Sequence, residues 1–446
     1  MLDQMKETPS VSDQTPRPGS VPPAARRTTL LTGTVVVAIG LGVTGVGTLA
    51  MLGLAARSMP SAEYADFAVW WTVATLLGTS FGVFEVYLAR LLIFELAGGG
   101  SPARVTGVML GRAMAMAGGL GVVIAALSPF LADELFSGEL APALLLWVFM
   151  CLAASQSLQR GAATGRHNMV AIATQLSTDG VARAAIIGVL ALTGNDSVTS
   201  LALGSCVAVV LSLVAGGRVI GPWLARPSVR GADVPLLPVV LLLIGAVGPL
   251  LANNGSVPWL KSTDEVGPHL LGAFAGAITL SRIPTQFFSA VMSPLLAHLS
   301  EAVELADEAA FERTRARAQL LTAGAGVAFV VAFALLGQLA IRIMLGPDFS
   351  LGVANLAVLA AASSGMFIGV VQQAALGALG LWDRIAWAWV VAAVAFVLVL
   401  LVPVDPLWRA TAAPLVGVVA ALVTMWLLGR NGWRSRSKVL ARAPRP

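Results

Sequence analysis

Four charged side chains lie inside apolar stretches of this chain, and they are the residues best placed to do chemistry. They are Glu85, Asp179, Arg183 and Arg282. A charge at the centre of a membrane-crossing helix costs roughly 2.5–3.5 kcal/mol on insertion scales, so it usually faces a bundle interior or a wet cavity. The four charges therefore predict a membrane protein with a polar internal pathway, which is the arrangement of a transporter.

The composition supports a membrane location for the whole chain. Of its 446 residues, 57% are hydrophobic and only 11% are charged, whereas soluble domains carry about 25% charged residues. Charge this sparse cannot cover a water-soluble surface. The net charge of +5 is spread over many loops without interleaved aromatic residues, so a nucleic-acid partner is not expected.

Twelve stretches are long enough to cross a membrane, which requires about 20 apolar residues each. They are residues 30–56, 66–92, 108–131, 141–161, 169–193, 199–221, 236–257, 268–292, 318–345, 352–376, 382–404 and 409–429. Most of the 28 Lys and Arg residues then fall on the side of the two termini. Because positive charge favours the cytoplasmic side, we expect a multi-pass plasma-membrane protein with both termini in the cytoplasm.

The spans divide into two sets of six at the loop 222–235. Short segments repeat between the halves: LFSGEL at 135–140 matches MLGPDF at 344–349 in pattern, although such short turns can also agree by chance. Six spans is an even number, so the repeat is parallel, and a substrate cavity between the halves is expected. The predicted fold is all-α, with two six-helix bundles around a central cavity.

The predicted domains follow from this division. Residues 1–27 are rich in Pro, Ser and Thr and are expected to form a disordered cytoplasmic tail. The two bundles are predicted over residues 28–226 and 227–432, and a basic cytoplasmic tail over 433–446.

Four segments resemble a known family over roughly residues 30–425. They are ARSMPSAEYADF at 56–67, QRGAATG at 159–165, SRIP at 281–284 with Pro294 and Leu299-Ser300 after it, and LGPDF at 345–349. In order and spacing they resemble the polysaccharide (O-antigen type) flippases of the multidrug/oligosaccharidyl-lipid/polysaccharide exporter superfamily. One departure is FEVY at 84–87, where family members often carry a small Asp-Gly-like break.

The resemblance implies a transporter that is not an enzyme. Its substrate would be a polyprenyl-diphosphate-linked oligosaccharide, moved from the inner to the outer leaflet by alternating access for cell-surface polysaccharide synthesis. Its partners would be membrane lipids, with a glycan polymerase and glycosyltransferases nearby. Three alternatives stay open. The first is a cation-coupled exporter of small molecules from the same superfamily, and the second is a membrane-embedded polymerase or glycosyltransferase, for which no large catalytic loop is present. The third is a flippase of peptidoglycan precursors, a close relative that often carries extra helices.

The fifth span carries the polar row Gln175, Asp179 and Arg183, whose spacing of four places them on one helical face. A diphosphate needs cationic donors, and arginine offers a planar fork that stays charged. Arg183 and Arg282 come from the two halves, so we expect both to bind substrate. The alternative is structural: Asp179 and Arg183 neutralise each other, and Arg282 snorkels or pairs with a helix end. Asp179 could also titrate or couple to a cation.

Further polar residues extend this set. Glu85 is followed by Arg90, and the two could form an anchoring pair, with a proton site at Glu85 as the other interpretation. Gln286 and Ser289 continue the polar face of the eighth span beyond Arg282. They are expected to contact sugar hydroxyls or to bridge helices.

The seventh span contains Gly248 and Pro249, followed by Asn253 and Asn254. Proline loosens a helix backbone, so this stretch could be a gate or a harmless kink. The amphipathic stretch 297–317 is expected to form a solvated cytoplasmic helix.

Catalytic and metal chemistry has little support in the sequence. His167, His269 and His298 are far apart, and Cys151 and Cys206 lie in apolar stretches without neighbouring ligands. There is no phosphate-binding Gly-rich loop with a lysine. We therefore expect no catalytic residue, no metal and no cofactor.

Overall fold

The computed structural model describes residues 23–97, 102–220, 248–252 and 254–430. In this part of the chain every regular element is an α-helix and no strand occurs, which confirms the all-α prediction. Ten helical segments of the described residues are long and apolar enough to cross a membrane, so the chain is a multi-pass membrane protein. The predicted span 236–257 and the bundle boundary at 226/227 fall mostly or wholly outside the described residues.

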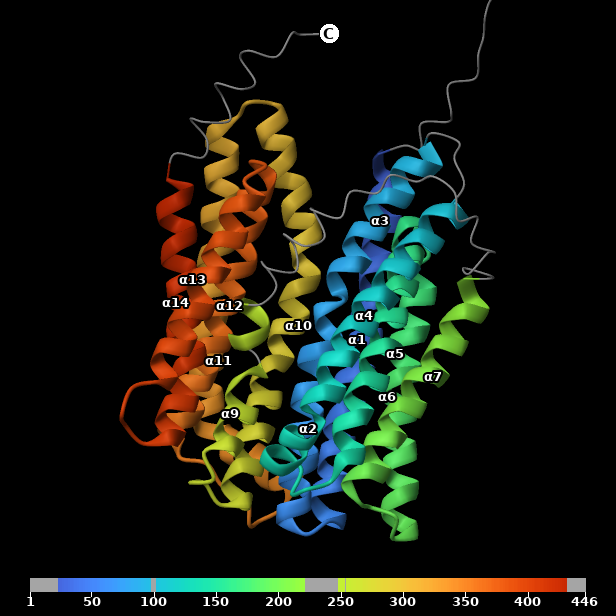
Figure 1. The fold of residues 1–446 in the computed structure, drawn as a ribbon. Helices are drawn as coiled ribbons and strands as arrows, with labels where there is room; N and C mark the ends of the chain where they lie inside the picture. Colours follow the sequence, from blue (N-terminus) through green and yellow to red (C-terminus); the bar gives the residue numbers. More distant parts are fainter. Residues whose placement is uncertain (1–22, 98–101, 221–247, 253, 431–446) are drawn as a thin grey trace, which may run out of the picture.

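The helices form two bundles that stand side by side (Figure 1). The first bundle, blue to green, contains α1 (Pro23–Ser58), α2 (Ser61–Ser80), α3 (Gly82–Ala97), α4 (Pro102–Leu135), α5 (Leu140–Gly165), α6 (Met169–Thr193) and α7 (Val198–Ile220). The second, yellow to red, contains α9 (Ser256–Ser262), α10 (Pro268–Glu304), α11 (Glu308–Leu345), α12 (Val353–Ala378), α13 (Trp382–Leu400) and α14 (Pro406–Gly429).

The helix α1 begins at Pro23, within the last part of the predicted tail 1–27, while residues 1–22 and 431–446 lie outside the described part. The stretch 297–317 is not the separate amphipathic helix that the sequence predicts. It forms the end of α10 and the start of α11, which are joined by a short turn at 305–307. Asp307 stabilises this turn because its side chain accepts a hydrogen bond of 2.8 Å from the backbone of Ala310.

The second predicted span is broken at Phe81, between α2 and α3. Hydroxyl groups near the break bond back to carbonyls of the preceding turn. Thr75 Oγ1 donates to the Trp71 carbonyl at 2.9 Å, and Thr79 Oγ1 donates to the Thr75 carbonyl at 2.6 Å. Such back-bonding weakens and bends a helix, and Gly82 directly after Phe81 adds backbone freedom.

The two bundles contact each other closely at the end that is lower in Figure 1. There the ring of Tyr64 at the start of α2 meets the ring of Phe349 edge-on, with centroids 5.3 Å apart. Arg57 at the end of α1 donates to the carbonyl of Ile343 near the end of α11. The ribbons converge at this end and diverge toward the upper end, where α11 begins and α14 finishes (Figure 1).

Candidate functional site

The polar row predicted on the fifth span lies on α6 and points into the first bundle. Gln175, Asp179 and Arg183 are all buried. Arg183 Nη2 lies 2.6 Å from Asp179 Oδ2 and 2.8 Å from Asp179 Oδ1. The structural alternative, in which these two charges neutralise each other, is therefore the arrangement that the side chains adopt.

Residues of α5 and α7 complete this network, and the sequence interpretation missed them. Gln156 Nε2 donates to Ser212 Oγ at 2.6 Å and to Asp179 Oδ1 at 3.3 Å. Gln175 Nε2 donates to Gln159 Oε1 at 2.7 Å. The only sequence signal was that two glutamines, three residues apart, interrupt an apolar span. These groups surround the buried charged pair, and Gln156 adds a hydrogen bond to its carboxylate.

Arg183 also reaches α2. Its guanidinium lies over the ring of Trp71, with the central carbon 4.7 Å from the ring centroid, a cation–π distance. The Nε of Arg183 is buried and makes no hydrogen bond to any described residue. Arg183 thus points inward and contacts the carboxylate of Asp179 and the indole of Trp71, while its Nε remains without a described acceptor.

Arg282 lies on α10 in the second bundle. Its Nη1 donates to Asn254 Oδ1 at 2.6 Å, and the same oxygen lies 3.5 Å from Thr75 Oγ1 of α2. Its Nη2 is buried without a hydrogen-bond partner in the described part of the chain. No carboxylate among the described residues lies within 4 Å of Arg282. Arg282 is thus a half-buried arginine whose Nη2 is buried, with an amide partner but no described counter-charge.

Both arginines approach the same helix. Trp71 and Thr75 are one turn apart on α2 and share a face. Arg183 contacts Trp71 from the first bundle, and Arg282 reaches Thr75 through Asn254 from the second. The structure thus brings the two predicted cations to neighbouring turns of one helix.

A small cavity of about 20 Å³ adjoins Arg282 and is also lined by Ser281 and Ser363. The two serine hydroxyls lie 3.2 Å apart. The cavity has room for about one water molecule. In this conformation, then, the space beside Arg282 is too small for a sugar or a diphosphate.

Glu85 has a different partner from the one expected. Its Oε2 lies 2.8 Å from Nε of Arg160 on α5, and Arg160 Nη2 also donates to Ser157 Oγ at 3.1 Å. The side chain of Arg90 lies outside the described residues. Both members of the pair are partly exposed, at 27% for Glu85 and 19% for Arg160. The pair joins α3 to α5 at the upper end of the first bundle.

The remaining predicted residues are only partly described. The side chains of Gln286 and Ser289 lie outside the described residues, although their backbone belongs to α10; Asn253 is not described. Gly248 lies against α13, because a Cβ added there would be 2.1 Å from the carbonyl oxygen of Trp389. Pro249 lies in the same short helical segment, 248–252. Among the described side chains of this set, that of Asn254 contacts a predicted cation.

Metal chemistry gains no support from the described residues. Among them, no group of three or more His, Cys, Asp or Glu side chains is placed to hold a metal ion. Cys151 and Cys206 are both free thiols.

Two proteins of Mycobacterium tuberculosis resemble this chain in sequence. No model of a known protein family matches it. The protein Rv1510 of strain ATCC 25618 / H37Rv and the protein MT1558/MT1560 of strain CDC 1551 / Oshkosh are both described as uncharacterised. Each is 29% identical over 383 residues, which is 82% of this chain and 84% of the relative.

Several solved transporter structures share the architecture. An inward-facing multidrug resistance transporter of the MATE family and MOP superfamily matches with a TM-score of 0.68 at 12% identity, over 90% of this chain and 99% of its own. The lipid II flippase MurJ, in an inward closed conformation, matches with a TM-score of 0.64 at 12% identity, over 90% and 93%.

A MOP superfamily transporter from Pyrococcus furiosus matches with a TM-score of 0.61 at 13% identity, over 92% of this chain and 97% of its own. Its structure is described as having a binding pocket of reverse polarity that suggests a different function. These likenesses confirm the predicted fold class: the chain has the twelve-helix, two-bundle membrane fold of the MOP-superfamily transporters.

Proposed function

We propose that this protein is a flippase that moves a polyprenyl-diphosphate-linked oligosaccharide from the inner to the outer leaflet of the plasma membrane. A lipid II flippase shares its fold, so this architecture can serve lipid flipping as well as drug export. The proposal places the upper end of Figure 1, where α1 begins and α14 ends, in the cytoplasm. Glycosyltransferases would supply the substrate there, and a glycan polymerase would use it on the other side.

The observation that carries the proposal is that Arg282 lacks both a counter-charge and a full set of hydrogen bonds among the described residues. An uncompensated charge in a low-dielectric interior is expensive, yet Arg282 has a buried, unbonded Nη2 and no described counter-charge. A diphosphate would provide both the missing negative charge and the missing acceptor. Arginine forms short, bidentate hydrogen bonds with phosphate oxygens, so Arg282 is the main substrate-binding cation in this proposal.

Arg183 has a secondary role in the same proposal. Asp179 already neutralises it at 2.6 Å, which leaves its Nε and its position over Trp71 to help line the pathway. Asp179 then serves mainly to keep Arg183 charged and oriented. Gln175, Gln286 and Ser289 remain candidates for contacts with sugar hydroxyls.

Alternating access would require the lower end to open while the upper end closes. The inter-bundle contacts at the lower end involve few charged groups, namely the bond from Arg57 to the Ile343 carbonyl and the ion pair of Asp66 with Lys261. Breaking and remaking so few polar contacts costs only a few kcal/mol. The small cavity at Arg282 would widen in that movement to admit the diphosphate.

The test uses the purified full chain in proteoliposomes with a fluorescent polyprenyl-diphosphate-linked disaccharide as the probe. Flipping is followed as the loss of probe accessible to an external quencher. Arg282→Gln removes one charge-assisted interaction, so we expect the flipping rate to fall about 10- to 100-fold. Arg218→Gln is the matched control because Arg218 is an exposed arginine on α7, and it should flip at the wild-type rate.

Three outcomes would refute the proposal. They are no movement of probe by the wild-type chain, flipping by Arg282→Gln at the wild-type rate, and a fall in the flipping rate of Arg218→Gln as large as that of Arg282→Gln. Transport of a small organic cation that is unaffected by Arg282→Gln would instead favour the small-molecule exporter.

A further inference from the structure

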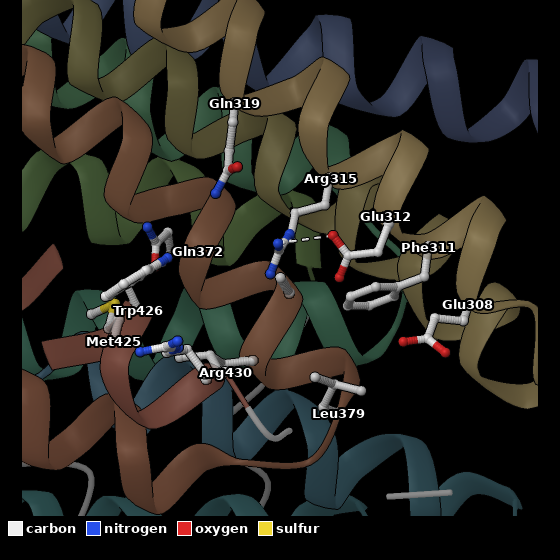
Figure 2. A pocket seen from close by; sticks show the side chains of 13 residues that line it. Glu308, Phe311, Glu312, Arg315, Gln319, Gln372, Leu379, Met425, Trp426 and Arg430 are labelled. Carbon is white, nitrogen blue, oxygen red and sulfur yellow. Dashed lines mark ion pairs between the residues drawn. The ribbon is translucent and has the colours of Figure 1, made fainter. Parts of the chain in front are cut away.

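A second cavity, unrelated to the four charges above, lies at the upper end of the second bundle. Its volume is about 570 Å³, and it is formed by α11, α12 and α14 (Figure 2). This volume is within the range of small-molecule sites, about 300–1,000 Å³. The cavity is about 14 Å further along α12 than the small cavity at Arg282, since Ser363 lines one, Gln372 lines the other and a helix rises 1.5 Å per residue.

The depth of this cavity relative to the membrane follows from the charges that bracket two helices. On α14 the residues 410–429 carry no charge and are flanked by Arg409 and Arg430; this run spans about 30 Å, the thickness of the hydrocarbon core. On α11 the uncharged run 318–341 begins directly after Arg317. Arg315 and Arg430 therefore lie at the same hydrocarbon boundary, at the level of lipid headgroups.

Two arginines face this cavity from opposite walls, Arg315 from α11 and Arg430 from the end of α14 (Figure 2). Arg315 Nη2 pairs with Glu312 Oε2 at 2.8 Å, while its Nε is buried and makes no hydrogen bond to a described residue. Arg430 lies over the ring of Trp426 at 4.9 Å. No carboxylate of the described chain comes within 4 Å of Arg430.

The rest of the lining offers further donors and an apolar wall. The side-chain amides of Gln319 and Gln372 border the cavity. The other acid in the lining, Glu308, lies at the rim beyond the ring of Phe311 and does not lie between the arginines (Figure 2). Leu379 belongs to the apolar part of the wall. A ligand that suits this lining has a negative, oxygen-rich head and an apolar body.

We propose that this cavity binds the headgroup of an anionic phospholipid from the adjacent leaflet. The phosphate lies between the guanidinium groups of Arg315 and Arg430, and Gln319 and Gln372 donate to its oxygens or to the headgroup hydroxyls. The first carbons of an acyl chain lie against Leu379. Trp426, which is 54% exposed, marks the interface because tryptophan is enriched at headgroup depth. The lipid here is a bound component and not the transported cargo.

The test measures lipid binding to the full chain in detergent by native mass spectrometry. Phosphatidylglycerol is titrated as the anionic lipid and phosphatidylcholine as the zwitterionic one; inorganic phosphate is added as a competitor. We expect at least one phosphatidylglycerol per protein, bound about tenfold more tightly than phosphatidylcholine. Millimolar inorganic phosphate should not displace it, since phosphate lacks the apolar body.

The double substitution Arg315→Gln with Arg430→Gln should weaken phosphatidylglycerol binding at least tenfold. The matched control is Arg313→Gln with Arg317→Gln, because both of these arginines are exposed on α11 and neither lines the cavity. The control removes the same net charge and should bind like the wild type. If both double variants lose affinity equally, the attraction is a general charge effect and the proposal fails.

A milder substitution protects the test against misfolding. Gln372→Leu removes one donor, keeps the net charge and should weaken phosphatidylglycerol binding several-fold with an unchanged melting temperature. Wild-type affinity in both Gln372→Leu and the Arg315/Arg430 double variant would overturn the proposal. Displacement by inorganic phosphate alone would also overturn it, because the site would then take a free anion and not a lipid.

Discussion

Lys261 Nζ lies 2.7 Å from Asp66 Oδ1 and joins the two bundles through α9 and α2. The other carboxylate oxygen of Asp66 accepts a hydrogen bond of 2.6 Å from Ser137 Oγ, which lies between α4 and α5. Asp66 is only 4% exposed, so it depends on both partners for its stability as an anion. It is therefore a charged contact that helps to hold the lower end closed.

Lys261→Ala should loosen that end. The side chain of Lys261 is 23% exposed and that of Asp66 is 5% exposed. The free energy by which the pair stabilises the closed form should therefore lie between that of a surface pair and that of a buried pair, about 1–2 kcal/mol. This is a five- to thirtyfold shift in the balance between closed and open forms. Spin labels at the exposed positions Ala62 and Glu265, in a chain without Cys151 and Cys206, would report it as a longer distance.

Lys261→Arg is the control, because it keeps the positive charge at the same position. It should preserve the wild-type distance distribution. An unchanged distribution in Lys261→Ala would show that the ion pair does not hold the bundles together.

Asp179→Asn should destabilise the first bundle, although it leaves the size of the side chain nearly unchanged. It leaves Arg183 buried without its counter-charge, and breaking a buried pair in this way costs about 3–5 kcal/mol. Thermal unfolding in detergent should show a clear fall in melting temperature. The double substitution Asp179→Leu with Arg183→Met removes both charges and should be less destabilised than Asp179→Asn alone.

That comparison also separates the two roles that the sequence left open for Asp179. A purely structural acid predicts that the double variant recovers stability and retains flipping above the level of Asp179→Asn. A coupling acid predicts instead that neither variant flips substrate, even where the double variant recovers stability.

Much of the architecture was predictable because membrane insertion imposes a pattern that is visible in the sequence. A helix that crosses hydrocarbon needs a long apolar run, so spans such as 169–193 and 382–404 correspond closely to α6 (Met169–Thr193) and α13 (Trp382–Leu400). The break at Phe81 was missed because apolar composition continues through it. The hairpin of α10 and α11 was missed because the amphipathic stretch 297–317, which contains its turn, resembles a separate surface helix.

The candidate site was predictable only where partners are near in sequence. Asp179 and Arg183 are four residues apart on one helix, so their pairing followed from helical geometry. Gln156 is uncharged and lies on another helix, and its contact with Asp179 depends on how α5 packs on α6. The choice of Arg160 over Arg90 as partner of Glu85 depends in the same way on tertiary packing.

Gly180→Ala should be poorly tolerated because α1 and α6 pack backbone to backbone there. A Cβ on Gly180 would lie 2.6 Å from the Cα of Thr44 and 2.7 Å from the carbonyl oxygen of Val43. The helices would have to separate, which would also lengthen the 2.6 Å hydrogen bond from Thr44 Oγ1 to the Leu176 carbonyl. We expect a loss of about 1–3 kcal/mol, seen as a lower melting temperature in detergent.

Gly42→Ala on α1 is the matched control, since a Cβ there meets nothing within 4 Å. Alanine is the better helix former by about 1 kcal/mol, so this variant should melt at the wild-type temperature or slightly above it. A similar fall in both variants would indicate that α1 needs glycine for a reason other than close packing.

Glu85→Gln decides between an anchoring pair and a proton site. The pair with Arg160 is partly exposed, so its removal should cost about 1 kcal/mol or less. If the pair only anchors α3 to α5, Glu85→Gln should flip substrate at close to the wild-type rate at every pH. The charge-reversed double variant Glu85→Arg with Arg160→Glu should also regain stability relative to either single reversal. A proton site predicts instead that Glu85→Gln abolishes flipping, and that the reversed pair fails to restore it because the carboxyl group has moved to α5.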